Sequence, residues 1–273
     1  MICPLIFKKE FNLIKNYEAF ILSYNNYKNS SIIASFLTKK NIISSICYQA
    51  KKNSKAFGSD LESISKLNIN IYEKKSDSLS ILKESNIIKN YNILEKSIYS
   101  SLAVFYIREL LLYFAKDFDE RYFILMDKTL YSLEENEKQN QDNLKYYINI
   151  LLRAFEIKLL YIAGLSPLLD NCVLCERENA NYYSINEGGL ICINCKINIK
   201  DAMELDYNDI VFMKIIKHSS MLDIVKNNDI IKFYNNSIST IRDILQKSIY
   251  NHIHIELKSL KVLEEILFTD NNL

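Results

Sequence analysis

The first 80 residues alternate short runs of branched and aromatic residues with clusters of Asn, Ser and Lys. This pattern is typical of β-strands joined by polar loops. The runs that predict strands span residues 17–24, 31–37, 42–50 and 67–73. Four or five strands within about 80 residues favour a small barrel of the oligonucleotide-binding type, the OB-fold, over a sandwich, which usually needs more strands. We therefore expect an OB-fold over residues 1–80.

Beyond Ser78 the hydrophobic positions recur at helical spacing. In residues 95–116, Leu102, Phe105 and Tyr106 begin one apolar face. Residues 144–162 keep helical spacing throughout, and Gly164 supplies a stop. The polar segment between them, residues 134–143, predicts a solvated connection. Further amphipathic stretches predict helices at residues 211–218, 238–250 and 257–267.

Composition narrows the class of protein. A chain of 273 residues with 49% hydrophobic and 25% charged residues is typical of globular proteins. Only four Gly and two Pro disfavour a turn-rich, all-β fold. No apolar run approaches the roughly 20 residues that cross a bilayer, and the opening residues lack the features of a secretion signal. We expect a cytoplasmic protein that does not enter a membrane.

The charges are unevenly distributed although the whole chain carries only +1. Residues 1–80 hold twelve Lys and six acidic residues, a net +6, which leaves −5 for residues 81–273. Between Glu18 and Asp60 no acidic residue occurs. Such asymmetry indicates a polyanionic partner for the basic part. A general lysine bias of the chain explains many Lys but not the local absence of Asp and Glu.

Four of the six cysteines form a doubled Cys-x2-Cys pattern: Cys172, Cys175, Cys192 and Cys195. Two such turns brought together make the four-thiolate shell that structural Zn²⁺ prefers, and a filled shell argues against catalytic zinc. Gly188 and Gly189 precede the second pair, where a hairpin must turn back. The pattern predicts a zinc ribbon with one structural Zn²⁺, and a pair of redox-active dithiols is the weaker reading.

The sequence therefore predicts an α+β protein: an OB-fold at residues 1–80, then a helical domain at residues 81–273 with a zinc ribbon at about residues 168–200. No catalytic constellation emerges. The three histidines lie outside any metalloprotease motif, and four glycines cannot supply a phosphate-binding loop. We expect a protein that is not an enzyme.

The residues around the cysteines resemble a known family. Residues 151–195 combine a long leucine-rich helix, a Gly, a Pro, two Cys-x2-Cys pairs and an intervening Gly-Gly, as in the bacterial recombination mediator RecO family. Residues 17–55 resemble the opening barrel of that family, and residues 257–267 resemble its closing helix. Asn41, Gln49 and Glu176 stand where the family often has Gly.

The resemblance implies a non-enzymatic DNA-repair factor of the recombination pathway. Such a factor binds single- and double-stranded DNA, acts with RecR, engages single-strand-binding protein, anneals complementary strands and helps RecA to load. A barrel with lysines and no nearby carboxylate suits that function, because it can neutralise phosphates without reading sequence. The net acidic helical half is better suited to protein partners, among them the short acidic tail of single-strand-binding protein.

Candidate residues follow from this resemblance and from the charge pattern. The lysines expected to contact phosphate are Lys28, Lys39, Lys40, Lys51, Lys52 and Lys55. The aromatic residues that could stack on bases, each of them also a candidate core residue, are Tyr24, Tyr27, Phe36, Tyr48 and Phe57. Arg153 and Lys158 are candidate charge partners for the acidic tail, although solvated helix positions are their more common role.

Two other functions stay open at this point. A zinc-ribbon adapter for protein interaction or transcription would bind DNA weakly and independently of salt. A metal-dependent nuclease would need acidic metal ligands, for which the sequence offers no candidates.

Overall fold

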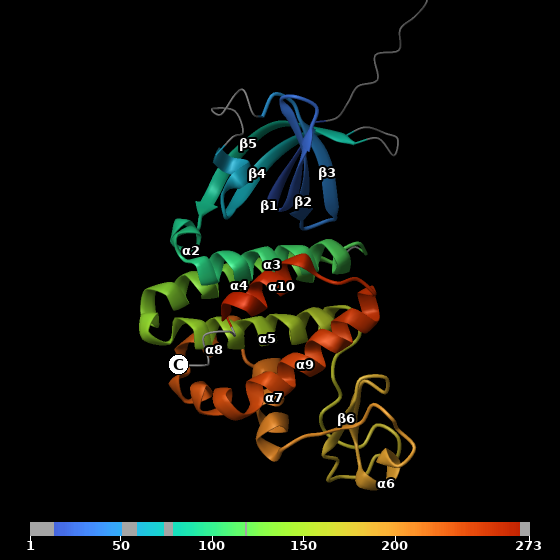
Figure 1. Cartoon of the computed structure of the whole chain (residues 1–273). Coiled ribbons are helices and arrows are strands. Elements are labelled where there is room, and N and C mark those ends of the chain that lie inside the picture. The colour runs from blue at the N-terminus through green and yellow to red at the C-terminus, as the bar shows by residue number, and fades with distance from the viewer. Residues whose placement is uncertain (1–13, 51–58, 74–78, 118, 268–273) are drawn as a thin grey trace, which may run out of the picture. The chain divides into compact units, whose positions relative to one another are not determined.

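The computed structural model describes residues 14–50, 59–73, 79–117 and 119–267. The chain divides into two compact units: a barrel that ends at Asn90, and a helical unit that begins at Tyr91 and with which the turn residues Lys39–Asn41 are also grouped. Figure 1 shows the elements of each unit. Among the helices in this described part, none combines the length and the apolar character needed to cross a bilayer.

The first unit is a closed five-stranded barrel in the order β1-β2-β3-β5-β4. Its strands are β1 (Ile14–Tyr27), β2 (Ser31–Thr38), β3 (Ile42–Cys47), β4 (Ser65–Tyr72) and β5 (Ser80–Asn90), with a short helix α1 (Ser59–Glu62) before β4. All neighbours are antiparallel except β3 and β5, whose short parallel pairing closes the barrel. This is the OB-fold that the strand pattern predicts.

The period-two pattern explains the barrel interior. In β4, Leu67, Ile69 and Ile71 are buried while the residues between them are partly exposed, so alternate side chains enter the core. The side chains that fill the interior are Ala19, Ile21, Ile32, Ala34, Phe36, Ile43, Leu67, Ile69, Ile71 and Leu82.

The boundary between the two units lies ten residues beyond the predicted one. Residues 81–90 form most of β5, which pairs with β4 along its length, so the division at 80/81 moves to Asn90 and Tyr91. In β5 only Leu82 and Ser85 are buried, which removes the alternation that identifies a strand. With Lys83, Glu84 and Lys89 added, the net charge of the barrel sequence is +7 and that of residues 91–273 is −6.

The helical unit consists of helices and one small sheet. The helices are α2 (Asn92–Lys96), α3 (Ile98–Phe114), α4 (Glu120–Gln139), α5 (Leu144–Ile162), α6 (Ile193–Lys196), α7 (Tyr207–His218), α8 (Met221–Lys226), α9 (Tyr234–Ile253) and α10 (Lys258–Leu267). Two 3-10 turns span Gln141–Asn143 and Asn228–Phe233, and the sheet has the strands β6 (Tyr182–Ser184), β7 (Gly189–Ile191) and β8 (Met203–Glu204).

Helix α5 is the centre of this unit. Every residue from Tyr147 to Ile157 is buried, because α3, α4, α7, α8 and α9 all pack against it. At its end, the Leu165 N–H donates to Leu160 and the Gly164 N–H donates to Tyr161, the paired bonds of a Schellman motif. Gly164 has a φ of 77°, so this stop requires glycine.

The predicted solvated connection at residues 134–143 is wrong for its first half. Helix α4 continues to Gln139, and Asn136 and Glu137 are buried on its inner face. Glu137 accepts a hydrogen bond from the Ser100 hydroxyl of α3. The Glu, Lys and Gln residues of this segment have good helix propensity, and one buried carboxylate with a partner on α3 is enough to dock it.

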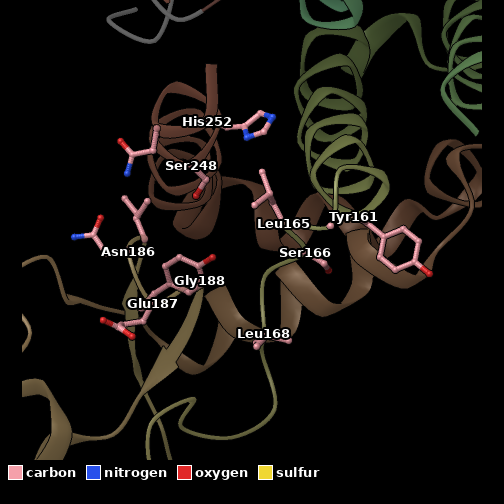
Figure 2. Close-up of a pocket in the computed structure, with 13 residues that line it drawn as sticks. Tyr161, Leu165, Ser166, Leu168, Asn186, Glu187, Gly188, Ser248 and His252 are labelled. Atoms are coloured by element: carbon pink, nitrogen blue, oxygen red, sulfur yellow. The ribbon is translucent and has the colours of Figure 1, made fainter. Parts of the chain in front are cut away.

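The ribbon joins the helices at the end of α5. A cavity of about 610 Å³, which we call the ribbon cavity, opens at this junction (Figure 2). It is lined by the end of α5 and the residues after it (Tyr161, Leu165, Ser166), the hairpin turn of the ribbon (Asn186, Glu187, Gly188) and α9 (Ser248, Asn251, His252).

Arg153 and Glu156 form an ion pair inside the helical unit. Their side chains are 1% and 0% exposed, and the Arg153 Nη2 lies 2.5 Å from Glu156 Oε1. The Tyr106 hydroxyl donates to the same oxygen at 2.7 Å. Burial raises the pKa of Glu156 to about 7, although the Arg153 charge opposes that rise. The two side chains of α5 therefore compensate each other's charge inside the core.

We expect Arg153→Met to destabilise the protein by about 3 kcal/mol, near the lower end for breaking a buried pair, because Glu156 can take up a proton. Arg153→Met combined with Glu156→Leu should recover much of that loss. Urea unfolding followed by circular dichroism measures both. Equal losses in the single and double variants would show that the pair contributes nothing beyond packing.

The same variant predicts a pH dependence. Without Arg153 the folded pKa of Glu156 rises above about 7, while its unfolded value stays near 4.5. In this variant, protonation of Glu156 stabilises the folded state. That contribution is complete below the unfolded pKa of Glu156 and is lost as the pH rises through its folded pKa. The stability deficit of Arg153→Met should therefore grow as the pH rises above 7, and a deficit that shrinks would contradict the assignment.

Candidate metal centre and nucleic-acid interface

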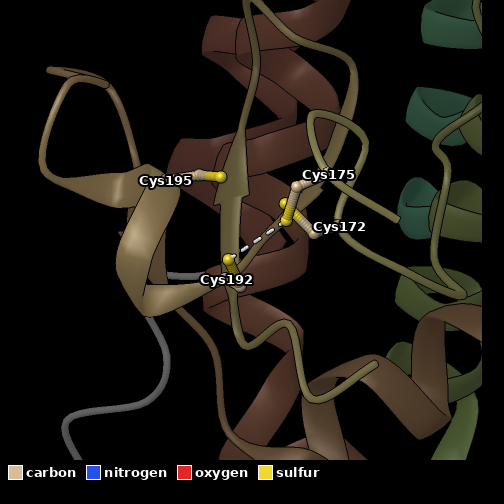
Figure 3. A group of neighbouring side chains, drawn as sticks. All are labelled: Cys172, Cys175, Cys192 and Cys195. Atoms are coloured by element: carbon tan, nitrogen blue, oxygen red, sulfur yellow. Dashed lines mark hydrogen bonds between the residues drawn. The ribbon is translucent and has the colours of Figure 1, made fainter. Parts of the chain in front are cut away.

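The four cysteines of the doubled motif meet at one point of the ribbon. Cys172 and Cys175 come from the loop after α5, Cys192 follows β7, and Cys195 lies on α6 (Figure 3). Their sulfur atoms all lie within 4.8 Å of one another, and the Sγ atoms of Cys175 and Cys192 are 3.6 Å apart. Tetrahedral Zn–S bonds of about 2.3 Å place sulfurs about 3.8 Å apart, so the cluster fits a four-thiolate metal site.

Backbone N–H groups around the cluster favour thiolates at two of the four positions. Burial alone raises the pKa of Cys172, but N–H groups of the two knuckles outweigh it and lower that pKa to about 6. The Cys195 N–H lowers the pKa of Cys192. The pKa of Cys195 rises to about 12, because its thiol hydrogen-bonds to Cys175 and Cys192. Such N–H···S bonds also orient sulfur ligands toward a metal.

Close backbone packing holds the two knuckles together. The Leu190 N–H donates to Leu168 at 2.9 Å, and the Val173 N–H donates to Leu190 at 2.8 Å. A Cβ on Gly189 would lie 2.8 Å from the Leu168 carbonyl oxygen and 2.5 Å from Val173 Cγ1. Glycine is therefore needed at Gly189 for close approach, a role that the hairpin reading of Gly188 and Gly189 did not identify.

Two residues that replace the family's usual glycines have left-handed backbones. Gln49 has a φ of 55° and Glu176 a φ of 62°, a region in which L side chains are strained. Glu176 lies in the first knuckle, and its N–H donates to Cys172 at 2.8 Å. The first knuckle keeps its geometry with a side chain at this position, at a cost in conformational energy.

The lysines of the acid-free stretch lie at both ends of β2. Lys28 is exposed in the β1–β2 turn, with its Nζ 5.3 Å from the centre of the Tyr27 ring. Lys39 and Lys40 are exposed in the β2–β3 turn at the other end of the strand. Lys51, Lys52 and Lys55 lie outside the described residues, as does Phe57.

The aromatic candidates divide between surface and core. Tyr24 and Tyr48 are 44% and 50% exposed, whereas Phe36 is fully buried in the barrel interior. Tyr27 is half-buried beside Lys28. Of these candidates, Tyr24 and Tyr48 therefore expose ring surface for stacking, whereas Phe36 is a core residue.

Neither candidate charge partner of the acidic tail is an exposed residue of the helix surface. Arg153 is buried in its pair with Glu156, which corrects its expected position on a helix surface. Lys158 is half-buried, and its ammonium donates to the carbonyl oxygens of Ile216 and Lys217 at 2.8 and 3.0 Å. Burial lowers the pKa of Lys158 to about 8. The structural role of Lys158 is to donate hydrogen bonds to the carbonyl oxygens at the end of α7.

Comparison with known proteins finds a family model that matches each of the two units. The family model described as Recombination protein O C terminal matches residues 96–261, and the model described as Recombination protein O N terminal matches residues 13–91. The chain belongs to the RecO family. The end of the N-terminal match coincides with the end of the barrel at Asn90, so the RecO family division agrees with the structural one.

Curated relatives agree with this assignment over nearly the whole chain. The DNA repair protein RecO of Desulfatibacillum aliphaticivorans is 27% identical over 259 residues, which cover 91% of this chain and 95% of that protein. The DNA repair protein RecO of Syntrophus aciditrophicus is 26% identical with the same coverage of both chains. The resemblance inferred from the residues is confirmed, and the chain is a member of a DNA-repair family.

Replacing Glu176 by Gly should stabilise the ribbon by about 0.5 to 1 kcal/mol, since glycine adopts the left-handed backbone without strain. Glu178→Gly is the matched control, because Glu178 is also exposed but is absent from the positions with positive φ. Resistance of the bound metal to a chelator measures the effect. Similar behaviour of the two variants would show that strain at Glu176 has no energetic consequence.

Proposed function

We propose that this chain is a non-enzymatic DNA-repair factor that binds single- and double-stranded DNA, promotes strand annealing and helps RecA to load together with RecR. The observation that carries the proposal is the OB-fold barrel with exposed Lys28, Lys39 and Lys40 in a stretch without acidic residues. A basic barrel surface of this kind binds phosphates without reading sequence. A cytoplasmic location follows from this function.

The positions of these lysines suit a strand that runs along β2. The eight residues of β2 span about 26 Å, and the lysines lie at both ends. OB-folds cover about 4 to 16 nucleotides, so one bound strand can reach both ends. Lys51, Lys52 and Lys55, which lie outside the described residues, remain candidates from the sequence.

Lys39→Ala combined with Lys40→Ala should flatten the slope of log affinity against log salt by about 1.4 on single strands, because each phosphate contact contributes about 0.7. Lys28→Ala should flatten it by about 0.7. The matched control is Lys226→Ala combined with Lys258→Ala, a pair of exposed lysines in the helical unit. A salt titration with oligonucleotides of different sequence measures the slopes, and unchanged slopes in all three variants would remove these lysines from the interface.

We further propose that Cys172, Cys175, Cys192 and Cys195 hold one structural Zn²⁺. The four sulfurs close the coordination shell, so the ion would stabilise the ribbon and leave no position for a reacting water. Elemental analysis of reduced protein should find one zinc per chain. Cys192→Ser should lose the metal and loosen the ribbon, while the helices remain folded on their own apolar faces. Metal-free protein with an intact ribbon would contradict the proposal.

The partners that we propose on the protein side are RecR and the acidic tail of single-strand-binding protein. The helical unit is the candidate receptor for the tail, but the structure gives no support for Arg153 as its contact, and the Lys158 ammonium already binds two carbonyl oxygens. Direct binding of the tail peptide to the full chain tests this partner.

A protein-interaction adapter is the second candidate function. Leu174, Ile193 and Ile197 on the two knuckles are 48%, 55% and 83% exposed, which gives the ribbon an apolar surface next to its cysteines. An adapter of this class would bind DNA weakly and without salt dependence. The salt titration above therefore separates it from the DNA-repair factor.

A further inference from the structure

Two cavities of the helical unit meet at one aromatic side chain, Tyr161. The ribbon cavity has a volume of about 610 Å³. The second, of about 480 Å³, lies between α5 and the turn from α7 to α8, and we call it the lysine cavity. Tyr161 lines both and is 56% exposed. Both volumes lie within the range of small-molecule sites.

The ribbon cavity has mainly apolar walls with a few polar groups and little charge. Its walls carry the amides of Asn186 and Asn251, and the His252 ring points toward the end of α5 (Figure 2). Ser166 also lines it, although its hydroxyl oxygen is buried and has no hydrogen-bond partner among the described residues. Among the described residues that line the cavity, Glu187 carries the one charge. Two amides and aromatic rings on a mainly apolar wall suit a planar, uncharged group that both donates and accepts hydrogen bonds, and they disfavour a phosphate.

The lysine cavity has the opposite character. Lys158, Lys217 and His218 line it, together with the hydroxyl side chains of Ser219 and Ser220, and no carboxylate does. An ammonium has three donors; Lys158 uses two of them on carbonyl oxygens, and Lys217 uses one on the Pro167 carbonyl at 2.8 Å. The remaining donors are available to an anion.

We infer that the two cavities together bind one nucleotide unit of a nucleic-acid strand, with the base in the ribbon cavity and the phosphate in the lysine cavity. Tyr161 lies between them, where it can stack on a base. The Arg121 guanidinium is 5.9 Å from its ring centre, but it is paired with the Asp119 carboxylate at 2.6 Å and adds no net charge. This inference rests on the proposed DNA-binding function and adds a second contact, on the helical unit, to the one on the barrel.

A nucleotide explains both cavities better than an acidic peptide does. Carboxylates of a peptide would match Lys158 and Lys217, but Glu187 would repel any further carboxylate that entered the ribbon cavity. An uncharged base has no such conflict, because the amides of Asn186 and Asn251 can pair with donors and acceptors on its edge.

The test uses the full chain with a short oligothymidylate that carries one 4-thiothymidine for photocrosslinking. We expect crosslinked peptides that contain Tyr161 or His252, in addition to peptides of the barrel. In a background of Lys28→Ala, Lys39→Ala and Lys40→Ala, Tyr161→Ala should weaken oligonucleotide binding about 10-fold, within the range for loss of one stacked base. Tyr161→Phe should bind like that background, since it keeps the ring. Tyr131→Ala, which removes a 41% exposed tyrosine of α4, is the matched control.

Each outcome distinguishes the nucleotide site from the alternatives. Normal DNA binding by the parent, with crosslinks only in the barrel and no effect of Tyr161→Ala, would overturn this inference and leave the proposed function intact. A parent that binds no DNA would overturn both. Competition by free thymidine monophosphate would identify a mononucleotide as the source of the same chemistry, whereas competition by oligonucleotide alone identifies a strand. If Lys217→Ala weakened the binding of an acidic peptide while Tyr161→Ala did not, and neither variant changed the affinity for the oligonucleotide, the lysine cavity would be assigned to a peptide instead.

Discussion

Burial of α5 is the constraint on which the helical unit depends. An unbroken run of buried residues from Tyr147 to Ile157 requires helices on all sides, and it also requires that Arg153 and Glu156 neutralise each other inside the core. The helix can leave this environment only at its end, where the Schellman turn at Gly164 redirects the chain toward the ribbon. Tyr161 lies on that last turn and is exposed. The ribbon and both cavities are therefore placed by the way in which α5 ends.

The parts that could be predicted from the sequence are those in which local chemistry leaves few alternatives. The four cysteines could be predicted to lie together, because two Cys-x2-Cys turns commonly form one four-thiolate cluster. The helix at residues 144–162 appears with its predicted bounds, since nineteen residues without a breaker, followed by Gly164, define both of its ends. The first four strands were also recognised, because short runs of branched and aromatic residues are separated by clusters of Asn, Ser and Lys.

What the sequence did not reveal depends on contacts between distant segments. Strand β5 carries mostly exposed residues, and its pairing with β4, rather than its own pattern, makes it a strand. The polar end of α4 is held by Ser100, and Arg153 is buried because Glu156 and Tyr106 meet it there. In the sequence, Gly189 resembles an ordinary turn glycine. Only the structure shows that glycine is needed there because Leu168 packs against it. Glu156 lies only three residues from Arg153, but the other partners lie on other elements of the fold, so no local period contains the information.

Net charge is a poor guide to where an anion can bind within a unit. Residues 91–273 carry −6, yet the lysine cavity is lined by Lys158 and Lys217 without a carboxylate. Both lysines are there for a structural reason: the carbonyl oxygens at the end of α7 and at Pro167 need donors, and the negative end of a helix dipole favours cations. Binding carbonyl oxygens does not itself neutralise an ammonium, because a carbonyl is neutral. The Asp170 carboxylate, which pairs with Lys214, offsets part of the charge of Lys217. A lysine that donates to backbone carbonyls can still attract an anion, and two such lysines beside an exposed ring provide elements of a nucleotide site without any excess of basic residues.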